Sequence, residues 1–221
     1  MFKKGLKIVL LGPQASGKGT QGKLLSETFN IIRISTGEMF RSEIAKKTKL
    51  GREIQSYIST GNLVPDDITS KVLQNRINDM DCRNGFILDG YPRDIKQAKF
   101  LDSITNIDFA IEINISNEEA QKRIENRRVC ENCGRSYDLV LFPPKKDGIC
   151  DKCGGKVIKR LDDYPEAIKK RLNIYREEVK PIIKFYEKKG VLIRVRGDDT
   201  IENIFEDIKG KMVKKLGSKI I

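Results

Sequence analysis

Apolar and polar positions alternate along the chain in two rhythms, one typical of buried strands and one typical of amphipathic helices. Short β-rich runs precede helical patterns at residues 7–11 and 18–29, 85–88 and 94–101, and 109–115 and 117–128. A last such pair lies at residues 191–195 and 201–216. Repeated strand–helix units form right-handed crossovers, which place the strands in a parallel sheet with helices on both faces. The pattern therefore predicts an α/β fold.

Several helix starts are legible in the sequence. Ser35 with Glu38, and Ser116 with Glu119, have the spacing of a capping box, in which a serine side chain and a glutamate satisfy the first N–H groups of a helix. Pro165 suits the first turn of a long helix that reaches toward residue 189.

Two stretches interrupt the alternation, and we expect both to be insertions into the sheet-forming core. Residues 35–64 indicate short helices separated by Gly51 and Gly61. Residues 127–164 lose helical periodicity, gain Pro143 and Pro144, and hold four of the five cysteines.

Composition narrows the classes of partner. The chain of 221 residues has a formal net charge of +12, which favours anionic partners such as nucleotides, nucleic acid or an acidic membrane surface. It lacks Trp, which disfavours a base-stacking surface for nucleic acid. No apolar stretch approaches the roughly 20 residues of a membrane span. Residues 6–11 are too short an apolar run for a signal peptide, so we expect a cytoplasmic protein with reduced or metal-bound cysteines.

The first apolar run leads directly into a glycine-rich loop. Gly12, Gly17 and Gly19 frame the segment GPQASGKGT at residues 12–20, which follows a predicted strand and opens a predicted helix. In this context the GxxxxGK pattern indicates phosphate binding, because helix N–H groups and a lysine face the phosphate oxygens. Lys18 is expected to contact the transferred phosphates and Thr20 to lie near Mg²⁺. A glycine turn that binds nothing is the alternative interpretation.

A candidate Mg²⁺ group follows the next strand. Asp89 ends the apolar run at residues 86–88, so it should emerge at the carboxyl end of a neighbouring strand. Ligands of open parallel sheets bind at that edge. An acidic group there can organise Mg²⁺ and its waters, although a turn-forming Asp before Gly90 is the plainer interpretation.

The chain has no histidine, which excludes imidazole acid–base chemistry and catalytic triads. Phosphoryl transfer between two phosphates has no such requirement, because an acceptor phosphate is already ionised near neutral pH. The reaction instead needs positive charge in a rigid arrangement, which arginine supplies best.

Five separated segments resemble the adenylate kinase family, in the same order and across nearly the whole chain. They are GPQASGKGTQ at residues 12–21, ISTGEMFR at 34–41, DGYPRDIKQA at 89–98, RIENRRVC at 123–130 and RLDDYPEAIKKRL at 160–172. The resemblance implies a P-loop NTPase-like parallel sheet flanked by helices, built from residues 1–34, 65–126 and 165–221. It further implies two inserted mobile segments, an AMP-binding segment at residues 35–64 and a lid at residues 127–164.

The resemblance also implies the roles of individual residues. The ATP-binding residues would be Gly12, Ala15, Ser16, Gly17, Lys18, Gly19, Thr20, Arg123 and Arg127. The AMP-binding residues would be Thr36, Arg41, Ile58, Val64, Gly90, Arg93, Gln97, Arg160 and Arg171. The catalytic set would be Lys18, Arg41, Arg93, Arg127, Arg160 and Arg171. Asp162 and Asp163 would act in lid closure and in positioning arginines.

Two positions bear on specificity and on the loop. Gln97 carries both a donor and an acceptor, which match the amino group and the ring nitrogen of adenine. Ala15 stands where the family commonly has glycine, and its Cβ narrows the backbone conformations open to the loop. Glu38, where many relatives have Asp, is expected to serve mainly as the capping partner of Ser35.

Four cysteines have the spacing of a metal site. Cys130 and Cys133 are separated by sixteen residues from Cys150 and Cys153, and a glycine follows each pair. Four thiolates and no open position indicate a structural Zn²⁺ that holds the lid rigid. A redox pair or four unligated thiols are the alternatives. Cys82, the fifth, is expected to be a partly buried small side chain.

The sequence thus predicts a monomeric kinase that converts ATP and AMP into two ADP, with Mg²⁺ bound to the donor phosphates. A sister kinase with another donor or acceptor, such as GTP with AMP or ATP with UMP or CMP, shares the mechanism. A nucleic-acid-binding protein with a P-loop and a zinc module is a different class, as is a nucleotide sensor without catalysis. We expect small nucleotides as partners, with neither nucleic acid nor membrane.

Overall fold

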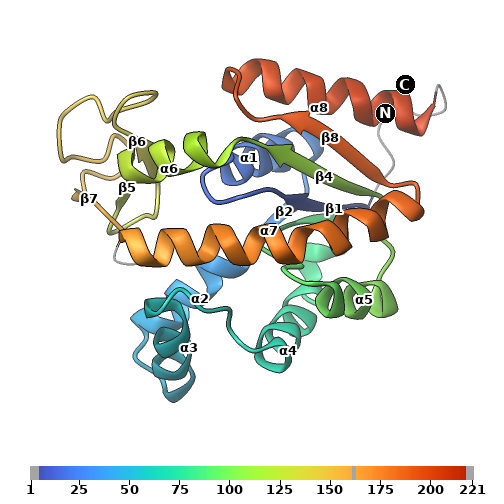
Figure 1. Ribbon diagram of the computed structural model, residues 1–221, viewed down its shortest axis with the longest axis horizontal. Coiled ribbons are helices and arrows are strands. Elements are labelled where there is room, and N and C mark those ends of the chain that lie inside the picture. Colours follow the sequence, from blue (N-terminus) through green and yellow to red (C-terminus); the bar gives the residue numbers. More distant parts are fainter. Residues whose placement is uncertain (1–4, 161–162, 218–221) are drawn as a thin grey trace.

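The computed structural model describes residues 5–160 and 163–217, and its main sheet has five parallel strands. Their order across the sheet is β2-β3-β1-β4-β8. Figure 1 labels β1, β2, β4 and β8 of this sheet. The strands are β1 (Leu6–Leu11), β2 (Ile32–Ser35), β3 (Gly85–Asp89), β4 (Phe109–Asn114) and β8 (Leu192–Arg196). The predicted α/β class is confirmed. The strand β2 was not predicted separately, since its four residues adjoin the first insertion.

Helices cover both faces of this sheet because alternate strand residues point to opposite sides. Leu6, Ile8 and Leu10 pack with α1 (Lys18–Phe29) and α8 (Ile201–Leu216). Val9 and Leu11 belong to a second cluster, on the other face. The helices of that face are α4 (Asp66–Ile77), α5 (Ile95–Ile104) and α7 (Pro165–Lys188), with a short 3-10 turn, η1, at Met80–Cys82.

The first insertion contains two helices, α2 (Thr36–Ala45) and α3 (Lys49–Ser59), below the sheet in Figure 1. The prediction that Gly51 separates them is wrong, because Gly51 lies inside α3. Its role is close packing: a Cβ at Gly51 would lie 2.3 Å from the Glu43 carbonyl oxygen. Gly61 does follow the end of α3, with a left-handed φ of +72°.

The second insertion forms a small antiparallel sheet with strand order β6-β5-β7. Its strands are β5 (Arg127–Cys130), β6 (Ser136–Asp138) and β7 (Val157–Ile158). The helix predicted at 117–128 is α6 (Asn117–Asn126), which ends two residues early. Arg127 has the extended conformation, with φ −66° and ψ 134°, since its backbone already pairs with Asp138 in the small sheet.

The predicted helix starts are present. The Ser35 and Ser116 hydroxyls accept hydrogen bonds from the backbone N–H groups of Glu38 and Glu119, at 3.3 and 3.1 Å. Pro165 occupies the first turn of α7. Among the described residues, no helix combines the length and the apolar content needed to cross a membrane.

Strand register brings the candidate groups to one edge of the main sheet. Asp89 pairs with Leu10 of β1 on one side and with Ser35 of β2 on the other. The glycine-rich loop leaves β1 at this carboxyl edge, where open parallel sheets bind ligands.

Candidate active site

The loop between β1 and α1 adopts a conformation that depends on small residues. Gly12 has a φ of +152°, and a Cβ there would lie 2.4 Å from the Ile113 carbonyl oxygen. Gly17 has a φ of +94° at the N-cap of α1. Ala15 takes a left-handed φ of +60°, and its side chain packs against the apolar cluster of Ile115 and its neighbours. The loop therefore retains its turn with a Cβ at Ala15.

The loop fits a phosphate group. Ser16 is fully buried, and its hydroxyl has no hydrogen-bond partner within the described part of the chain. Such an orphaned polar group is costly unless a ligand supplies its partner. The Lys18 ammonium donates to the carbonyl oxygens of Gly12 and Pro13, each at 2.7 Å. Gly19 and Thr20 continue the first turn of α1.

The surroundings of Lys18 disfavour its positive charge. Burial lowers the pKa of Lys18 to about 8; Arg93 and Arg127 act in the same direction, and Asp89 opposes them. Two further cations and one carboxylate therefore lie within electrostatic reach of Lys18. An anion bound beside Lys18 would offset the repulsion and raise the pKa of the lysine.

Asp89 lies at the end of β3 beside the first turn of α1. One of its carboxylate oxygens would be 3.6 Å from a Cβ at Gly19. The same oxygen accepts a hydrogen bond from Arg33, at 2.9 Å, and Arg33 also pairs with Glu38. A carboxylate, and the hydroxyl of Thr20 next to Gly19 in the chain, are the kinds of hard oxygen ligand that suit Mg²⁺ or its waters.

On the other side of Asp89, three of the predicted acceptor residues converge. The Thr36 hydroxyl donates to the Gly90 carbonyl oxygen at 3.0 Å, and Arg93 Nε donates to the same oxygen at 2.9 Å. Gly90 has a φ of +88°, and a Cβ there would lie 2.8 Å from the Thr36 hydroxyl. Glycine is needed at position 90 because the backbone has a left-handed φ there and the Thr36 hydroxyl leaves no room for a Cβ.

Gln97 lies in the first turn of α5 and is buried. Its Oε1 accepts a hydrogen bond from the Arg93 backbone N–H at 2.8 Å. Its Nε2 donates to Asp66 at 2.7 Å, and its own backbone N–H donates to Asp94, the N-cap of α5, at 2.8 Å. The amide side chain is therefore held at both ends.

Arg41, Ile58 and Val64, three further acceptor candidates, lie on the first insertion. The Arg41 guanidinium passes over Gly37, with Nη1 3.2 Å from where a Cβ of Gly37 would be. Ile58 and Val64 belong to an apolar cluster with Phe40 and Ile54. The contacts described for this cluster do not join Ile58 or Val64 to the groups around Gly90.

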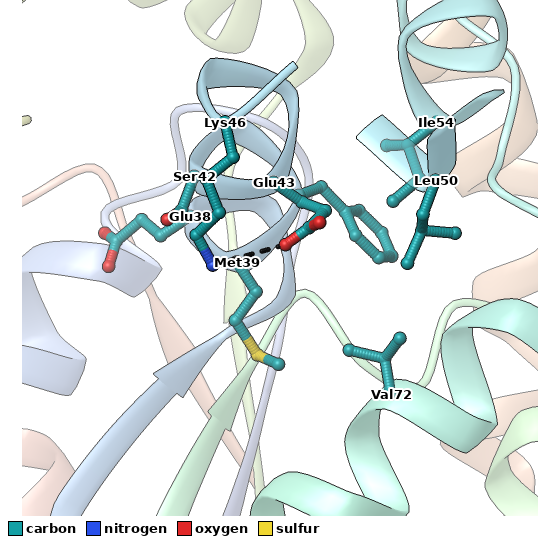
Figure 2. A pocket seen from close by; sticks show the side chains of 9 residues that line it. Glu38, Met39, Ser42, Glu43, Lys46, Leu50, Ile54 and Val72 are labelled. Atoms are coloured by element: carbon teal, nitrogen blue, oxygen red, sulfur yellow. Dashed lines mark hydrogen bonds and ion pairs between the residues drawn. The ribbon is translucent and has the colours of Figure 1, made fainter. Parts of the chain in front are cut away.

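A separate pocket of about 400 Å³ lies among α2, α3 and α4 (Figure 2). It is lined by Glu38, Met39, Phe40, Ser42, Glu43, Lys46, Leu50, Ile54 and Val72. Thr36, Arg41, Ile58 and Val64 do not line it, so this hollow is distinct from the predicted acceptor residues.

Two of the arginines predicted to bind phosphate, Arg127 and Arg171, share one carboxylate. Asp163 is buried and pairs with Arg127, and it lies 3.8 Å from Nη1 of Arg171. The Arg160 carbonyl oxygen accepts from the Asp163 N–H at 3.1 Å. Arg123 pairs along its own helix with Glu119, at 2.6 Å. Asp162 lies outside the described residues.

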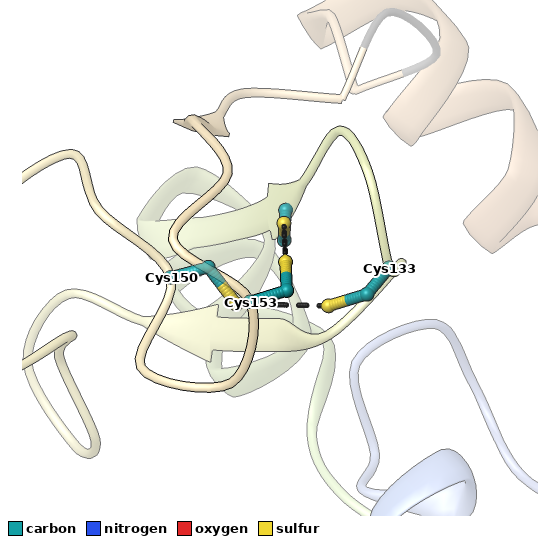
Figure 3. Close-up of side chains that lie close together, drawn as sticks. Cys133, Cys150 and Cys153 are labelled. Carbon is teal, nitrogen blue, oxygen red and sulfur yellow. Dashed lines mark hydrogen bonds between the residues drawn. The ribbon is translucent and has the colours of Figure 1, made fainter.

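The four clustered cysteines fit a tetrahedral metal site (Figure 3). Their sulfur atoms all lie within 4.8 Å of one another, with 3.4 Å between Cys130 and Cys153 and 3.6 Å between Cys133 and Cys150. Zinc–sulfur bonds of about 2.3 Å in a tetrahedron require sulfur separations of about 3.8 Å. The four thiols can therefore hold a metal ion. Cys82, far along the chain, is buried and bonds to the Arg76 carbonyl oxygen at 3.2 Å.

Three residues at the site were missed at the sequence level. Arg33 stands alone in the apolar run at residues 31–34, which was its only signal. Asp94 and Gln97 have the three-residue spacing of an N-cap and its partner, which could have been recognised. Asp66 gave no local signal, because its contact with Gln97 spans 31 positions of sequence.

The family model described as adenylate kinase matches residues 10–191. The chain belongs to the adenylate kinase family. It is therefore an enzyme of the phosphotransferase class. An adenylate kinase from Thermosipho africanus is 43% identical over 208 residues, which cover 92% of this chain and 97% of the relative. An adenylate kinase from Methanosarcina barkeri is 43% identical over 214 residues, which cover 95% of this chain and 99% of the relative.

Proposed function

We propose that this enzyme catalyses reversible transfer of a phosphoryl group from ATP to AMP, giving two ADP. The observation that carries this proposal is that Arg93 and Arg127 both lie close enough to Lys18 to lower its pKa. These cations come from the turn after β3, from β5 and from the phosphate loop. Two polyanions brought together at this edge of the sheet would find positive charge from three directions. A protein that binds only one phosphate chain does not require such an arrangement.

Each group has a role that follows from its chemistry. The phosphate loop and Lys18 hold the donor phosphates, Arg93 holds the acceptor phosphate beside Thr36 and Gly90, and Arg127 approaches from the second insertion. An oxygen of the acceptor phosphate attacks the terminal phosphorus of the donor, and the bond to the bridging oxygen of the departing diphosphate breaks. Mg²⁺, associated with Asp89 and Thr20, would neutralise charge on the donor phosphates. Arg41, Arg123, Arg160 and Arg171 complete the positive lining.

The acceptor is proposed to be AMP because Gln97 offers one donor and one acceptor for adenine. The names of the relatives agree with this choice. A steady-state assay with Mg·ATP against AMP, GMP, CMP and UMP tests it directly, with Lys18→Ala as the inactive control. Fast turnover with AMP supports the proposal, whereas turnover with UMP or CMP in its place would favour a sister kinase.

We also propose that the four-cysteine cluster binds a structural Zn²⁺. Four soft thiolates with no free ligand position are typical of closed zinc sites. The Tyr137 hydroxyl donates to Cys150 Sγ at 3.3 Å and accepts from the Asp151 N–H at 2.8 Å, which anchors one ligand. The small sheet has only a minor apolar core, so the metal would hold it together.

Nucleic acid remains the alternative partner for a chain of charge +12. Binding of a long polyanion would fall steeply with salt and would survive loss of Arg93. We propose instead that the working enzyme is a cytoplasmic monomer acting on small nucleotides. A filter-binding assay with RNA and DNA at 150 mM salt tests whether the enzyme binds nucleic acid. Sedimentation analysis tests whether it is a monomer.

A further inference from the structure

The Gln97 side chain is fixed in one of its two amide orientations. Oε1 faces the backbone N–H of Arg93, and Nε2 faces the Asp66 carboxylate. A backbone N–H can only donate, and an ionised carboxylate can only accept. Turning the amide over would place an NH₂ group against an N–H and an oxygen against a carboxylate. Gln97 is 2% exposed, and a buried donor or acceptor that faces a group of its own kind is costly.

This orientation matters because a glutamine by itself does not distinguish the purines. Adenine presents an amino donor at position 6 and a ring-nitrogen acceptor at position 1. Guanine and hypoxanthine present an oxygen acceptor and an N–H donor at the same two positions. A freely rotating glutamine matches either pattern by turning its amide over. Selection of one purine therefore requires something that fixes the polarity of the amide.

We propose that Asp66 is the specificity-determining positioning residue of the acceptor site, because it holds the Gln97 amide in the orientation that matches adenine. This inference rests on the proposed AMP-binding role of Gln97. With one Nε2 hydrogen given to Asp66, the second can donate to the ring nitrogen. With one Oε1 lone pair used by Arg93, the second can accept from the adenine amino group.

The neighbourhood of Asp66 supports the role of fixed acceptor. Asp66 begins α4, while Asp94 caps α5 and accepts from the Gln97 backbone N–H. Burial and the hydrogen-bonded Asp66 carboxyl raise the pKa of Asp94. The Asp66 oxygen that faces Gln97 lies 2.7 Å from Nε2 and accepts its hydrogen. The two helices thus hold the amide from both sides.

The test compares AMP with IMP, whose base differs from adenine at positions 6 and 1 alone. We expect Asp66→Ala to reduce the ratio of kcat/KM for AMP over IMP by about tenfold, the size of one lost buried hydrogen bond. The change should lie mainly in KM, with kcat retained. Asp66→Asn keeps the shape of the side chain but presents either an oxygen or an NH₂, so it should reduce the ratio by a smaller factor.

Asp67→Ala is the matched control, because Asp67 occupies the same first turn of α4 and is exposed. Both variants lose one carboxylate near the helix N-terminus, so a general effect on helix stability is shared. A merely structural role for Asp66 would lower the melting temperature without moving the AMP-to-IMP ratio.

An unchanged ratio in folded Asp66→Ala and Asp66→Asn would overturn the inference. Should the alanine variant fail to melt cooperatively, the isosteric asparagine variant decides the question alone. Failure of the unsubstituted enzyme to phosphorylate AMP is a different outcome, because it would refute the proposed function itself.

Discussion

Asp163 accepts two hydrogen bonds from the Arg127 guanidinium, at 2.8 Å from Nε to Oδ2 and 2.5 Å from Nη2 to Oδ1. Arg127 is the residue at which the chain enters the small sheet, and Asp163 lies just after the chain has left it. One buried carboxylate therefore joins the two connections between the small sheet and the main fold. Its second neighbour, Arg171, extends the link to α7.

Replacing this carboxylate should destabilise the protein strongly. In Asp163→Ala, two partly buried arginines lose their shared carboxylate, so the free energy of unfolding should fall by about 3 kcal/mol. Urea denaturation followed by circular dichroism measures this loss. Asp207→Ala, which breaks an exposed pair with Lys211, is the control and should cost under about 0.5 kcal/mol. Equal midpoints for the two variants would contradict the structural role of Asp163.

Nucleotide binding should take up a proton at alkaline pH. The pKa of Lys18 in the free enzyme is about 8, and a bound phosphate favours the charged form and so raises it. At pH 9 the free lysine is mostly neutral, whereas the bound lysine is charged, so binding should consume about one proton. At pH 7 both forms are charged, so uptake from this group should be small, and affinity should decline as the pH rises through 8.

Calorimetry of ATP binding in two buffers with different ionisation enthalpies measures the uptake. Lys23→Met removes an exposed lysine of the same helix and should leave proton uptake unchanged. Binding at pH 9 without proton uptake by the unsubstituted enzyme would show that Lys18 is not the group that titrates.

The purified enzyme should carry about one zinc atom per chain, measured by atomic emission. Cys150→Ser should lower the zinc content and the melting temperature together, because a bound metal would stabilise a sheet with little core of its own. Cys82→Ser changes a cysteine outside the cluster and should retain the metal. Native protein that is free of metal, and whose melting a strong chelator leaves unchanged, would refute the zinc assignment.

Arg33 should lower the affinity of the site for Mg²⁺, because its positive guanidinium lies 2.9 Å from the Asp89 carboxylate. In Arg33→Gln one positive charge is removed, so the Mg²⁺ concentration for half-maximal activity should fall by roughly fivefold, which corresponds to about 1 kcal/mol. A Mg²⁺ titration at fixed ATP measures it, with the surface variant Arg83→Gln as control. A higher Mg²⁺ requirement would mean that Arg33 chiefly positions Asp89.

Much of the main fold could be predicted because local pattern and burial agree there. The helices at residues 18–29 and 201–216 have the predicted limits, since each has one apolar face against the sheet. Gly51 misled the prediction because its reason is tertiary: α2 approaches it too closely for a side chain. Sequence reasoning reads glycine as a helix breaker and cannot foresee such an approach.

The candidate site likewise has a part that the sequence predicted and a part that it did not. The phosphate loop and the cysteine pairs are contiguous motifs whose spacing alone indicates their chemistry. Asp66 and Arg33 act through partners 31 and 56 positions away, and only the folded chain brings these partners together. Their contacts depend on strand order and helix placement, which no local pattern encodes.

The hydrogen bonds from Lys18 to the carbonyl oxygens of Gly12 and Pro13 give this side chain a structural role in the loop. These bonds make the ammonium an internal cross-link of the loop, in addition to its proposed contact with phosphate. A substitution of Lys18 therefore removes two hydrogen bonds that hold the loop, as well as the positive charge proposed to act on the phosphates. Amide hydrogen exchange at residues 12–17 of Lys18→Ala measures whether the loop has become less stable. Faster exchange there would show that the loss of activity has a structural cause in addition to the lost charge.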